Sequence, residues 1–536
     1  MRLGNLKVTS IILLLIIGIF LGTQIEKFFS DDSHRNNIVK FDDVLTYTEN
    51  NFVETVDTQK LVEAAINGML NQLDPHSVYI PANQVENVEE SIRGDFQGIG
   101  IEFQIVDDTI TVVTPITGGP SEKLGILSGD RIIKIENKDA TGFTSDEVRD
   151  QLRGKAGTKV NVTIYRPTIK KSINYQIARD TIPLYSVDTY LMYDSKTGYI
   201  SVSRFSETTY DEVKNALKDL KAKGMEQLIL DLRGNPGGLL SQAVKITDLF
   251  ISGKKKIVYT KGRRSEFDDT KFASEPSDFE NIPLILLVNN GSASASEIVS
   301  GAVQDWDRGL IVGETTFGKG LVQSQYQLPD NSALRLTVAK YYTPSGRLIQ
   351  RDYKELKSKD EYFSQAGEMN EQEGNNLYHS EEKDSNRGVY KTNGGRIVYG
   401  GGGITPDYII KSDQMTEYTT ELLKNNVFYQ FALSYLDKNS NKIQAEYKNL
   451  ISFINDFNIS ESEIKSFIRF AESKEVKYNK NDFIKDHSYI LVRIKAEIAR
   501  NFWKNIGWYS VILNADNQMI KAVTLFDEAK YLAHLK

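Results

Sequence analysis

The most apolar stretch of the chain runs from Val8 to Ile25 and contains seven consecutive Ile and Leu residues. A helix of these 18 residues is about 27 Å long, just enough to span a bilayer. Arg2 and Lys7 precede the run and acidic residues follow it, which places the N-terminus in the cytoplasm and the rest of the chain outside. A cleaved signal peptide is the alternative, but no small-residue cleavage site follows Leu21, which favours an uncleaved anchor.

The next two segments show different periodicities. Residues 36–92 repeat apolar positions at helical spacing, which predicts an N-terminal helical segment after the 1–35 anchor and linker. Residues 93–180 contain short alternating stretches, which predict a small β-rich domain with one or two helices. The alternating apolar positions at its start are Phe96, Ile99, Ile101, Phe103 and Ile105.

Residues 181–410 read as an α/β domain. Two continuous apolar runs, at 228–232 and 283–288, are each followed by a Gly-rich or Ser-rich turn and a helical pattern, which indicates a mostly parallel sheet. The stretch 351–400 is polar, and we expect an insertion or mobile loop there. Residues 411–536 have no Pro and a single Gly, Gly507, which predicts a helical C-terminal domain. The fold class is therefore multidomain, α/β and α+β.

The composition excludes several kinds of binding site and active site. The 536 residues carry 65 Lys and Arg against 72 Asp and Glu, a net charge of −7, which argues against a nucleic-acid binder. The absence of Cys excludes disulfides, thiolate metal sites and Cys nucleophiles. No His occurs between Ser77 and Tyr378, so a base in that region is not His, and we expect no His-ligated metal there. His76 beside Pro75 is better explained as a turn residue than as a ligand.

One segment offers a serine nucleophile. Ser294 lies between the buried run at 283–288 and the next helical pattern, where free N–H groups and the helix dipole favour negative charge. The alternative is a helix cap, because Ser294 and Glu297 fit the S-x-x-E capping box.

A candidate base for this serine, Lys319, lies further along the chain. Lys319 stands between two Gly residues, and in an extended segment Lys319, Leu321 and Gln323 share one face. A partly buried Lys can serve as the base for Ser, with Gln323 orienting the amine. The alternative for Lys319 is an ordinary solvated side chain.

A third segment, 231–238, ends in Gly237 and Gly238 after a buried strand. Adjacent Gly residues allow the backbone to approach closely and to present N–H groups to a developing oxyanion. A phosphate-binding loop is the rival, but neither of the usual Gly-rich phosphate motifs follows this strand.

Together these motifs resemble the carboxyl-terminal processing, or tail-specific, proteases of the Ser–Lys class, which carry a PDZ domain. The matching stretches are 73–77, 98–101, 129–130, 231–238, 291–297, 316–323, 341–346 and 403–407. They cover about residues 36–350 plus a final patch. The polar stretch at 351–400 and the helical domain after Asp407 depart from the family pattern.

The resemblance implies roles for individual residues. Ser294 matches the nucleophile, Lys319 the general base and Gln323 the residue that orients it, with Ser292 and Ser296 as alternative nucleophiles. The N–H of Ala295 and the backbone of Gly237 and Gly238 match the oxyanion hole. The β-rich domain resembles a PDZ domain on a crotonase-like or Clp-like protease core. The stretch that matches its loop for a terminal carboxylate is Gly98, Ile99, Gly100 and Ile101.

The resemblance thus implies a serine endopeptidase that recognises protein C-terminal tails and cleaves through an acyl-enzyme, with no cofactor and no metal. We expect a single-pass protein of the cell inner membrane with its catalytic part on the periplasmic side. Its expected partners are proteins or peptides with free C-termini and the membrane, with a second copy or an adaptor left open and no nucleic acid. The rivals are a non-catalytic PDZ-bearing scaffold and a crotonase-like acyl-CoA enzyme.

Overall fold

The computed structural model describes residues 32–354, 356, 358–365, 373–377 and 387–535. The predicted membrane anchor at 8–25 lies outside these residues. Of the helices within them, none combines the length and the apolar character needed to cross a membrane. The described residues divide into two compact units, one up to Tyr79 and one from Ile80 onward.

The described part of the first unit carries the helices α2 (Asp32–Asn51) and α3 (Thr58–Leu70). Asp57 caps α3, because its side chain accepts the N–H of Lys60 at 3.2 Å. After α3 the side chain of Asp74 accepts the N–H groups of His76 and Ser77 at 2.8 and 2.9 Å. His76 therefore lies in a turn held by a carboxylate, as expected of an Asp before Pro.

The second unit begins with helix α4 (Ala82–Arg93) and a β-rich module. Its sheet has the order β3-β4-β5-β7-β8, so β3 is an edge strand. The apolar side chains of this sheet and of helix α6 (Ser145–Leu152) form one core. The strands are β3 (Ile101–Val106), β4 (Thr109–Pro115), β5 (Arg131–Ile135), β7 (Lys159–Arg166) and β8 (Lys171–Ala178). Smaller elements are β2 (Asp95–Gly98), β6 (Lys138–Asp139), β9 (Asp180–Pro183) and helix α5 (Pro120–Lys123).

The α/β core follows, on a seven-stranded sheet of order β10-β11-β12-β15-β16-β22-β19. The strands from β11 to β22 are parallel, and the two end strands are antiparallel. Strands β12 and β15 are buried along their whole length, which is why they read as continuous apolar runs. The strands are β10 (Val187–Met192), β11 (Thr197–Val202), β12 (Gln227–Asp231), β15 (Leu284–Val288), β16 (Leu310–Gly313), β19 (Gly374–Asn375) and β22 (Tyr408–Ile409).

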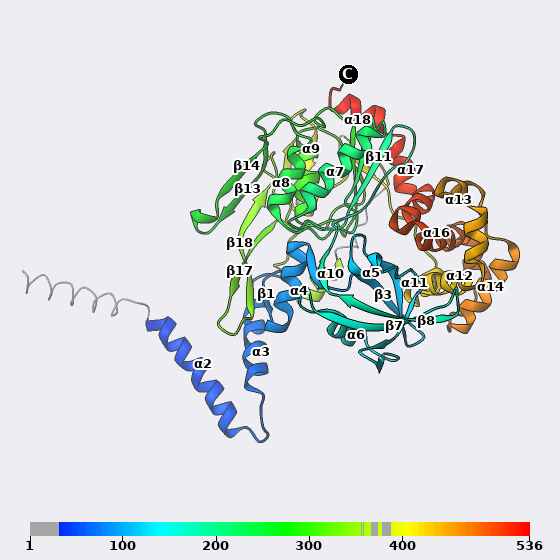
Figure 1. Ribbon diagram of the computed structural model, residues 1–536. Helices are drawn as coiled ribbons and strands as arrows, with labels where there is room; N and C mark the ends of the chain where they lie inside the picture. The colour runs from blue at the N-terminus through cyan, green and yellow to red at the C-terminus, as the bar shows by residue number, and fades with distance from the viewer. Residues whose placement is uncertain (1–31, 355, 357, 366–372, 378–386, 536) are drawn as a thin grey trace, which may run out of the picture. The chain divides into compact units, whose positions relative to one another are not determined.

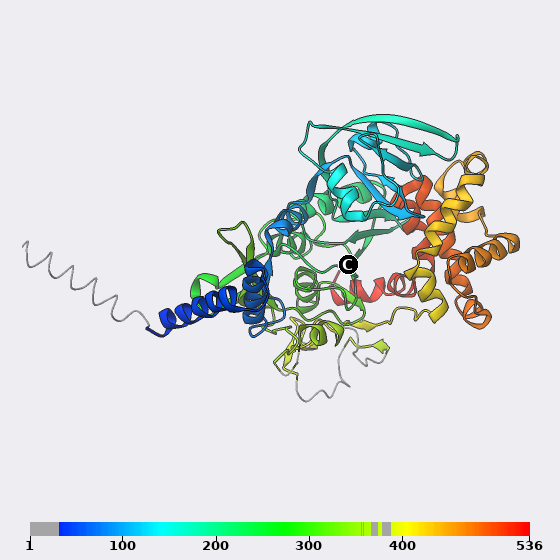
Figure 2. The same ribbon diagram turned by 90° about the horizontal axis from the view of Figure 1, so that it is seen from below.

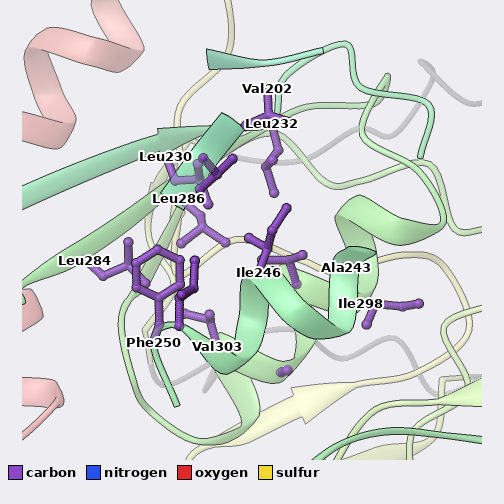
Figure 3. Packing of buried hydrophobic residues seen from close by; sticks show 14 of the residues in the cluster. Val202, Leu230, Leu232, Ala243, Ile246, Phe250, Leu284, Leu286, Ile298 and Val303 are labelled. Atoms are coloured by element: carbon purple, nitrogen blue, oxygen red, sulfur yellow. The ribbon is translucent and has the colours of Figure 1, made fainter. Parts of the chain in front are cut away.

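Helices cover both faces of this sheet. On one face lie α7 (Thr209–Ala222), α8 (Leu240–Asp248) and α9 (Ala295–Asp305), and Figure 3 shows Leu230, Leu284 and Leu286 packed against Ile246 and Phe250. On the other face, Met519 and Phe526 from the end of the chain pack against Ile229 and Leu287. These last helices are α17 (Asn517–Val523) and α18 (Phe526–Leu532), drawn in red in Figure 1.

A second sheet of the core carries one side of the candidate site. In it β18 pairs with both β13 and β17, and β13 pairs with β14. The strands are β13 (Lys256–Gly262), β14 (Asp269–Phe272), β17 (Leu321–Gln327) and β18 (Ala333–Tyr342).

The C-terminal part is helical, as predicted. Residues 417–512, here called the helical region, have their own core of aliphatic and aromatic side chains, in which Phe428, Phe453 and Phe467 are buried. Figures 1 and 2 both place this region beside the β-rich module, to which it is joined by the ion pairs Arg131–Asp437 and Arg500–Glu102. Its helices are α11 (Glu417–Lys424), α12 (Val427–Glu446), α13 (Leu450–Asp456), α14 (Glu461–Ser473), α15 (Lys480–Lys485) and α16 (His487–Ile512).

The described part of the stretch 351–400 differs from the polar insertion that we expected. It contains α10 (Lys359–Ser364), β20 (Val389–Lys391) and β21 (Ile397–Tyr399), and Tyr362 and Val398 are fully buried. Its most polar buried residue, Arg396, pairs with Asp307 at 2.7 Å and with Asp407 at 2.6 Å. The polar composition did not predict this packing, because the buried charged side chains form ion pairs with one another.

Replacing Asp407 with Asn should lower stability strongly, because Arg396 would then be a buried cation with one acidic partner in place of two. Breaking a buried pair typically costs about 3–5 kcal/mol, whereas an exposed helix pair contributes about 0.5 kcal/mol or less. Asp219→Asn, which breaks the exposed pair with Lys223, is the matched control. Thermal unfolding should show a large drop in the midpoint for Asp407→Asn alone; equal midpoints for the two variants would contradict this assignment.

Candidate active site

Ser294 lies immediately before helix α9, at the end of the turn that follows β15. Its backbone has φ 54° and ψ −109°, a conformation that a non-glycine residue rarely adopts. Strain of this kind persists only where the surroundings hold the residue in place, and it is common at functional sites. Two features, the buried side chains of Glu297 and Tyr341, hold Ser294 in this conformation.

The first feature is Glu297, whose side chain is completely buried. Its carboxylate accepts the N–H of Ser294 at 2.7 Å and, from the loop before β17, the N–H groups of Gly318 and Lys319 at 2.7 and 2.9 Å. The hydroxyl of Thr316 donates to it at 2.6 Å. Burial raises the pKa of Glu297 to about 7, while these donors favour the ionised form. One carboxylate thus ties the Ser294 turn to the Lys319 loop.

The second feature is Tyr341 on β18, also buried. Its hydroxyl lies 3.0 Å from the carbonyl of Ser294 and 2.6 Å from the carbonyl of Lys319. Sequence reasoning interpreted Glu297 as a helix cap and gave Tyr341 no role. The S-x-x-E spacing located Glu297 correctly, but nothing local in the sequence indicates that it also binds a loop about twenty residues further on.

Lys319 and Gln323 meet as their spacing predicted. The Lys319 Nζ donates to Gln323 Oε1 at 2.9 Å, and both side chains are partly buried. Gln323 belongs to β17, and Lys319 lies two residues before that strand. The amine therefore has a fixed acceptor on a strand of the second core sheet.

The neighbouring serines are bound to the backbone. Ser292 donates its hydroxyl to the carbonyl of Leu232 at 2.8 Å, and Ser296 donates to the carbonyl of Asn235 at 3.0 Å. Both side chains are fully buried. These contacts join the Ser294 turn to the 231–238 loop and favour structural roles for Ser292 and Ser296.

The two glycines of the 231–238 loop lie against Ser294 and Phe205. A Cβ on Gly237 would stand 2.7 Å from the Cβ of Ser294, and one on Gly238 would stand 2.1 Å from the carbonyl oxygen of Phe205. The Gly237 N–H donates to Asn235 Oδ1 at 2.9 Å. Within the described residues, the N–H groups of Gly238 and Ala295 have no acceptor.

The same loop is anchored to the end of the chain. Arg233 is partly buried and forms ion pairs with Asp231 at 2.6 Å and with Asp516 at 2.7 Å. The Arg233 guanidinium also donates to Gln518 Oε1 at 2.9 Å. Helix α17 therefore holds the start of the loop that carries Gly237 and Gly238.

The predicted carboxylate-binding stretch lies elsewhere, in the β-rich module between β2 and β3. Gly100 has φ +72°, and the carbonyl of Ile99 accepts the hydroxyl of Ser121 at 2.6 Å. In the described part of the chain, neither the Ile99 nor the Gly100 N–H donates to an acceptor. Gly98 ends β2, and Ile101 begins β3.

Across the ranges that the structure describes, no group of three His, Cys, Asp or Glu residues is arranged to hold a metal ion.

Four family models match separate parts of the chain. The model of peptidase family S41 matches residues 196–355, and the PDZ domain model matches 97–177. The model described as the activating protease CtpB N-terminal domain matches 23–84. A family of unknown function matches 418–504, which is most of the helical region.

Several curated proteins are similar. A carboxy-terminal-processing protease of Bartonella bacilliformis is 43% identical over 318 residues, which are 58% of this chain and 72% of that protein. The carboxy-terminal processing protease CtpA of Bacillus subtilis is 39% identical over 304 residues, 56% of this chain and 64% of that protein. A probable CtpA-like serine protease of Staphylococcus aureus is 35% identical over 349 residues, 65% of this chain and 69% of that protein.

Among solved structures, the photosystem II D1 C-terminal processing protease is 29% identical, with a TM-score of 0.33, and the match covers 57% of this chain and 82% of that one. The predicted family resemblance is confirmed by the relatives and by the family models. The chain belongs to the carboxy-terminal processing proteases of peptidase family S41 and is a serine-type peptidase with a PDZ domain.

Proposed function

We propose that this peptidase works through Ser294 and Lys319. In the first step Ser294 Oγ attacks the scissile carbonyl carbon while its proton passes to the neutral amine of Lys319. The resulting ammonium then protonates the leaving amine, and water hydrolyses the acyl-enzyme. Gln323 orients the amine. The observation that carries the proposal is that Glu297 and Tyr341 each bind both the Ser294 turn and the Lys319 loop.

The oxyanion hole is proposed as the N–H groups of Gly238 and Ala295. The Ala295 N–H lies at the N-terminus of α9, where the helix dipole favours negative charge. We expected the backbone of Gly237 and Gly238 to form part of the oxyanion hole. The Gly237 N–H is already bound to Asn235, so Gly237 is not proposed as a donor. Its missing Cβ leaves space beside Ser294.

Substrate recognition is proposed through the PDZ domain. The Ile99 and Gly100 N–H groups are suited to a terminal carboxylate, and the edge strand β3 can pair with an extended tail. A similar solved structure is named as the PDZ domain of the carboxy-terminal protease from Vibrio cholerae in complex with peptide, at 31% identity and a TM-score of 0.16.

We also propose that residues 8–25 anchor the chain in the inner membrane, with the catalytic part outside the cytoplasm. The support is the length of the apolar run and the basic residues before it.

Ser294→Ala and Lys319→Ala should each reduce peptide cleavage by several orders of magnitude, because each removes one partner of the proton transfer. Lys340→Ala, an exposed lysine on the neighbouring strand, is the control and should retain activity. Steady-state cleavage of a tail peptide measures all three. Near-normal turnover by Lys319→Ala would contradict the proposed base.

Activity should rise with pH through about 7, the pKa to which burial raises Glu297. Below that pH the carboxyl is protonated, and its O–H then faces N–H and O–H donors, which loosens both catalytic loops. Glu297→Gln should lose this step and lower kcat/KM by on the order of a hundred-fold, since small misplacements of reacting groups are costly. If Glu297→Gln keeps both the rise of activity through pH 7 and the normal kcat/KM, Glu297 does not hold the catalytic loops in place.

A peptide with a free C-terminus should be cleaved faster than the same peptide with an amidated one at sub-saturating concentration. A charge-assisted hydrogen bond is worth about 1.5–3 kcal/mol, or about ten- to a hundred-fold in affinity. Equal rates would remove tail recognition and leave the Ser–Lys chemistry untouched.

A further inference from the structure

A cavity of about 680 Å³ lies where the PDZ domain, the start of the protease core and the helical region meet. Strand β3 contributes Ile101 and Glu102 to its lining, and α16 contributes Trp503 and Ile506. Further lining comes from Thr114 and Pro115 of β4 and from Tyr185, in the segment after β9. The lining contains neither Ser294 nor Lys319, and it includes Ile101, which directly follows Ile99 and Gly100.

Exposed apolar side chains gather at this cavity. Tyr185 is 47% exposed, Tyr190 37% and Ile506 43%. Large apolar side chains scattered singly over a surface are ordinary, but several that line one concave site mark a place where a ligand binds.

A break in helix α16 shapes the part of the cavity wall that the helical region contributes. Lys504 has φ 52° and ψ −148°, a conformation that is costly for any residue with a side chain. Its amine holds the break in place through Glu122 at 2.5 Å and Thr117 at 3.0 Å, both in the PDZ domain. Gly507 permits the close packing of the next turn, since a Cβ there would stand 2.7 Å from the carbonyl oxygen of Ala499. The bend that shapes the cavity is therefore fixed by specific contacts.

The cavity adjoins the path proposed for a substrate tail. Strand β3 pairs with β4 on one side only, so a tail would add along its open edge. Side chains of an added strand alternate between the two faces, as those of β3 do. Because Ile101 and Glu102 line the cavity together with Thr114 and Pro115 of β4, the cavity borders the beginning of β3, where an added tail would start to pair.

We propose that this cavity is a specificity subsite that takes one apolar or aromatic side chain of the substrate polypeptide. The inference rests on the proposed tail recognition. Of the charged residues of the lining, Lys504 is paired with Glu122, Glu102 with Arg500 and Lys223 with Asp219, which leaves one acid and one cation, Asp188 and Arg204. Their balance gives no net preference for a charged side chain, whereas Trp503, Ile506 and Tyr185 favour an apolar one. Ile506 and Trp503 are thus proposed as specificity residues supplied by the helical region.

The test uses the full chain carrying Ser294→Ala, which should bind tails without cleaving them. Fluorescence polarisation measures its affinity for peptides that share a free C-terminus and differ at one upstream position, with Phe, Gly or Asp at each position in turn. One position should prefer Phe over Gly by about ten-fold or more, as expected for burying a large apolar side chain. Ile506→Asp should abolish that preference, and Ile506→Trp, which fills the space, should shift it towards small residues.

Ile484→Asp, which places the same charge on an exposed position of α15, is the matched control and should keep the preference. If free and amidated peptides bind alike, tail recognition itself fails. If the free carboxylate matters but no position prefers Phe, or the preference survives both Ile506 variants, the subsite alone is overturned. Circular dichroism of each variant verifies the fold, and Ile506→Trp keeps the test decisive where Ile506→Asp unfolds.

Discussion

The buried carboxylate of Glu297 is the interaction on which the candidate active site depends. It gathers four donors from two segments that are separate in sequence, the Ser294 turn and the 316–319 loop. Burying a carboxylate is costly unless hydrogen bonds compensate for the lost water, and here three backbone N–H groups and the Thr316 hydroxyl, all from the catalytic loops, compensate. The same contacts that satisfy Glu297 therefore fix the positions of the nucleophile and the base.

The far end of the chain completes this arrangement from the other side of the sheet. Helices α17 and α18 cover the face that α7, α8 and α9 leave open, and Asp516 and Gln518 hold Arg233 at the start of the glycine loop. Without this cover, Ile229 and Leu287 would face water. The C-terminal segment is thus part of the protease core as well as the end of the helical region.

Much of the fold was readable in the sequence because it follows from local pattern. Strands β12 and β15 are buried on both faces and read as continuous apolar runs, and the two-residue period brought Lys319 and Gln323 together. What the sequence did not reveal depends on distant partners. The second role of Glu297 and the burial of Arg396 between Asp307 and Asp407 each need residues that only the fold brings near. The break in α16 likewise depends on Glu122, far away in the PDZ domain.

The central claim is that Ser294 is the residue acylated by substrate. The most direct measurement is to label the native full-length chain with a fluorophosphonate, digest it and locate the modified residue by mass spectrometry. The account predicts one label, on Ser294, and no label after Lys319→Ala. A label on Ser292 or Ser296, or equal labelling of the Lys319→Ala protein, would contradict it.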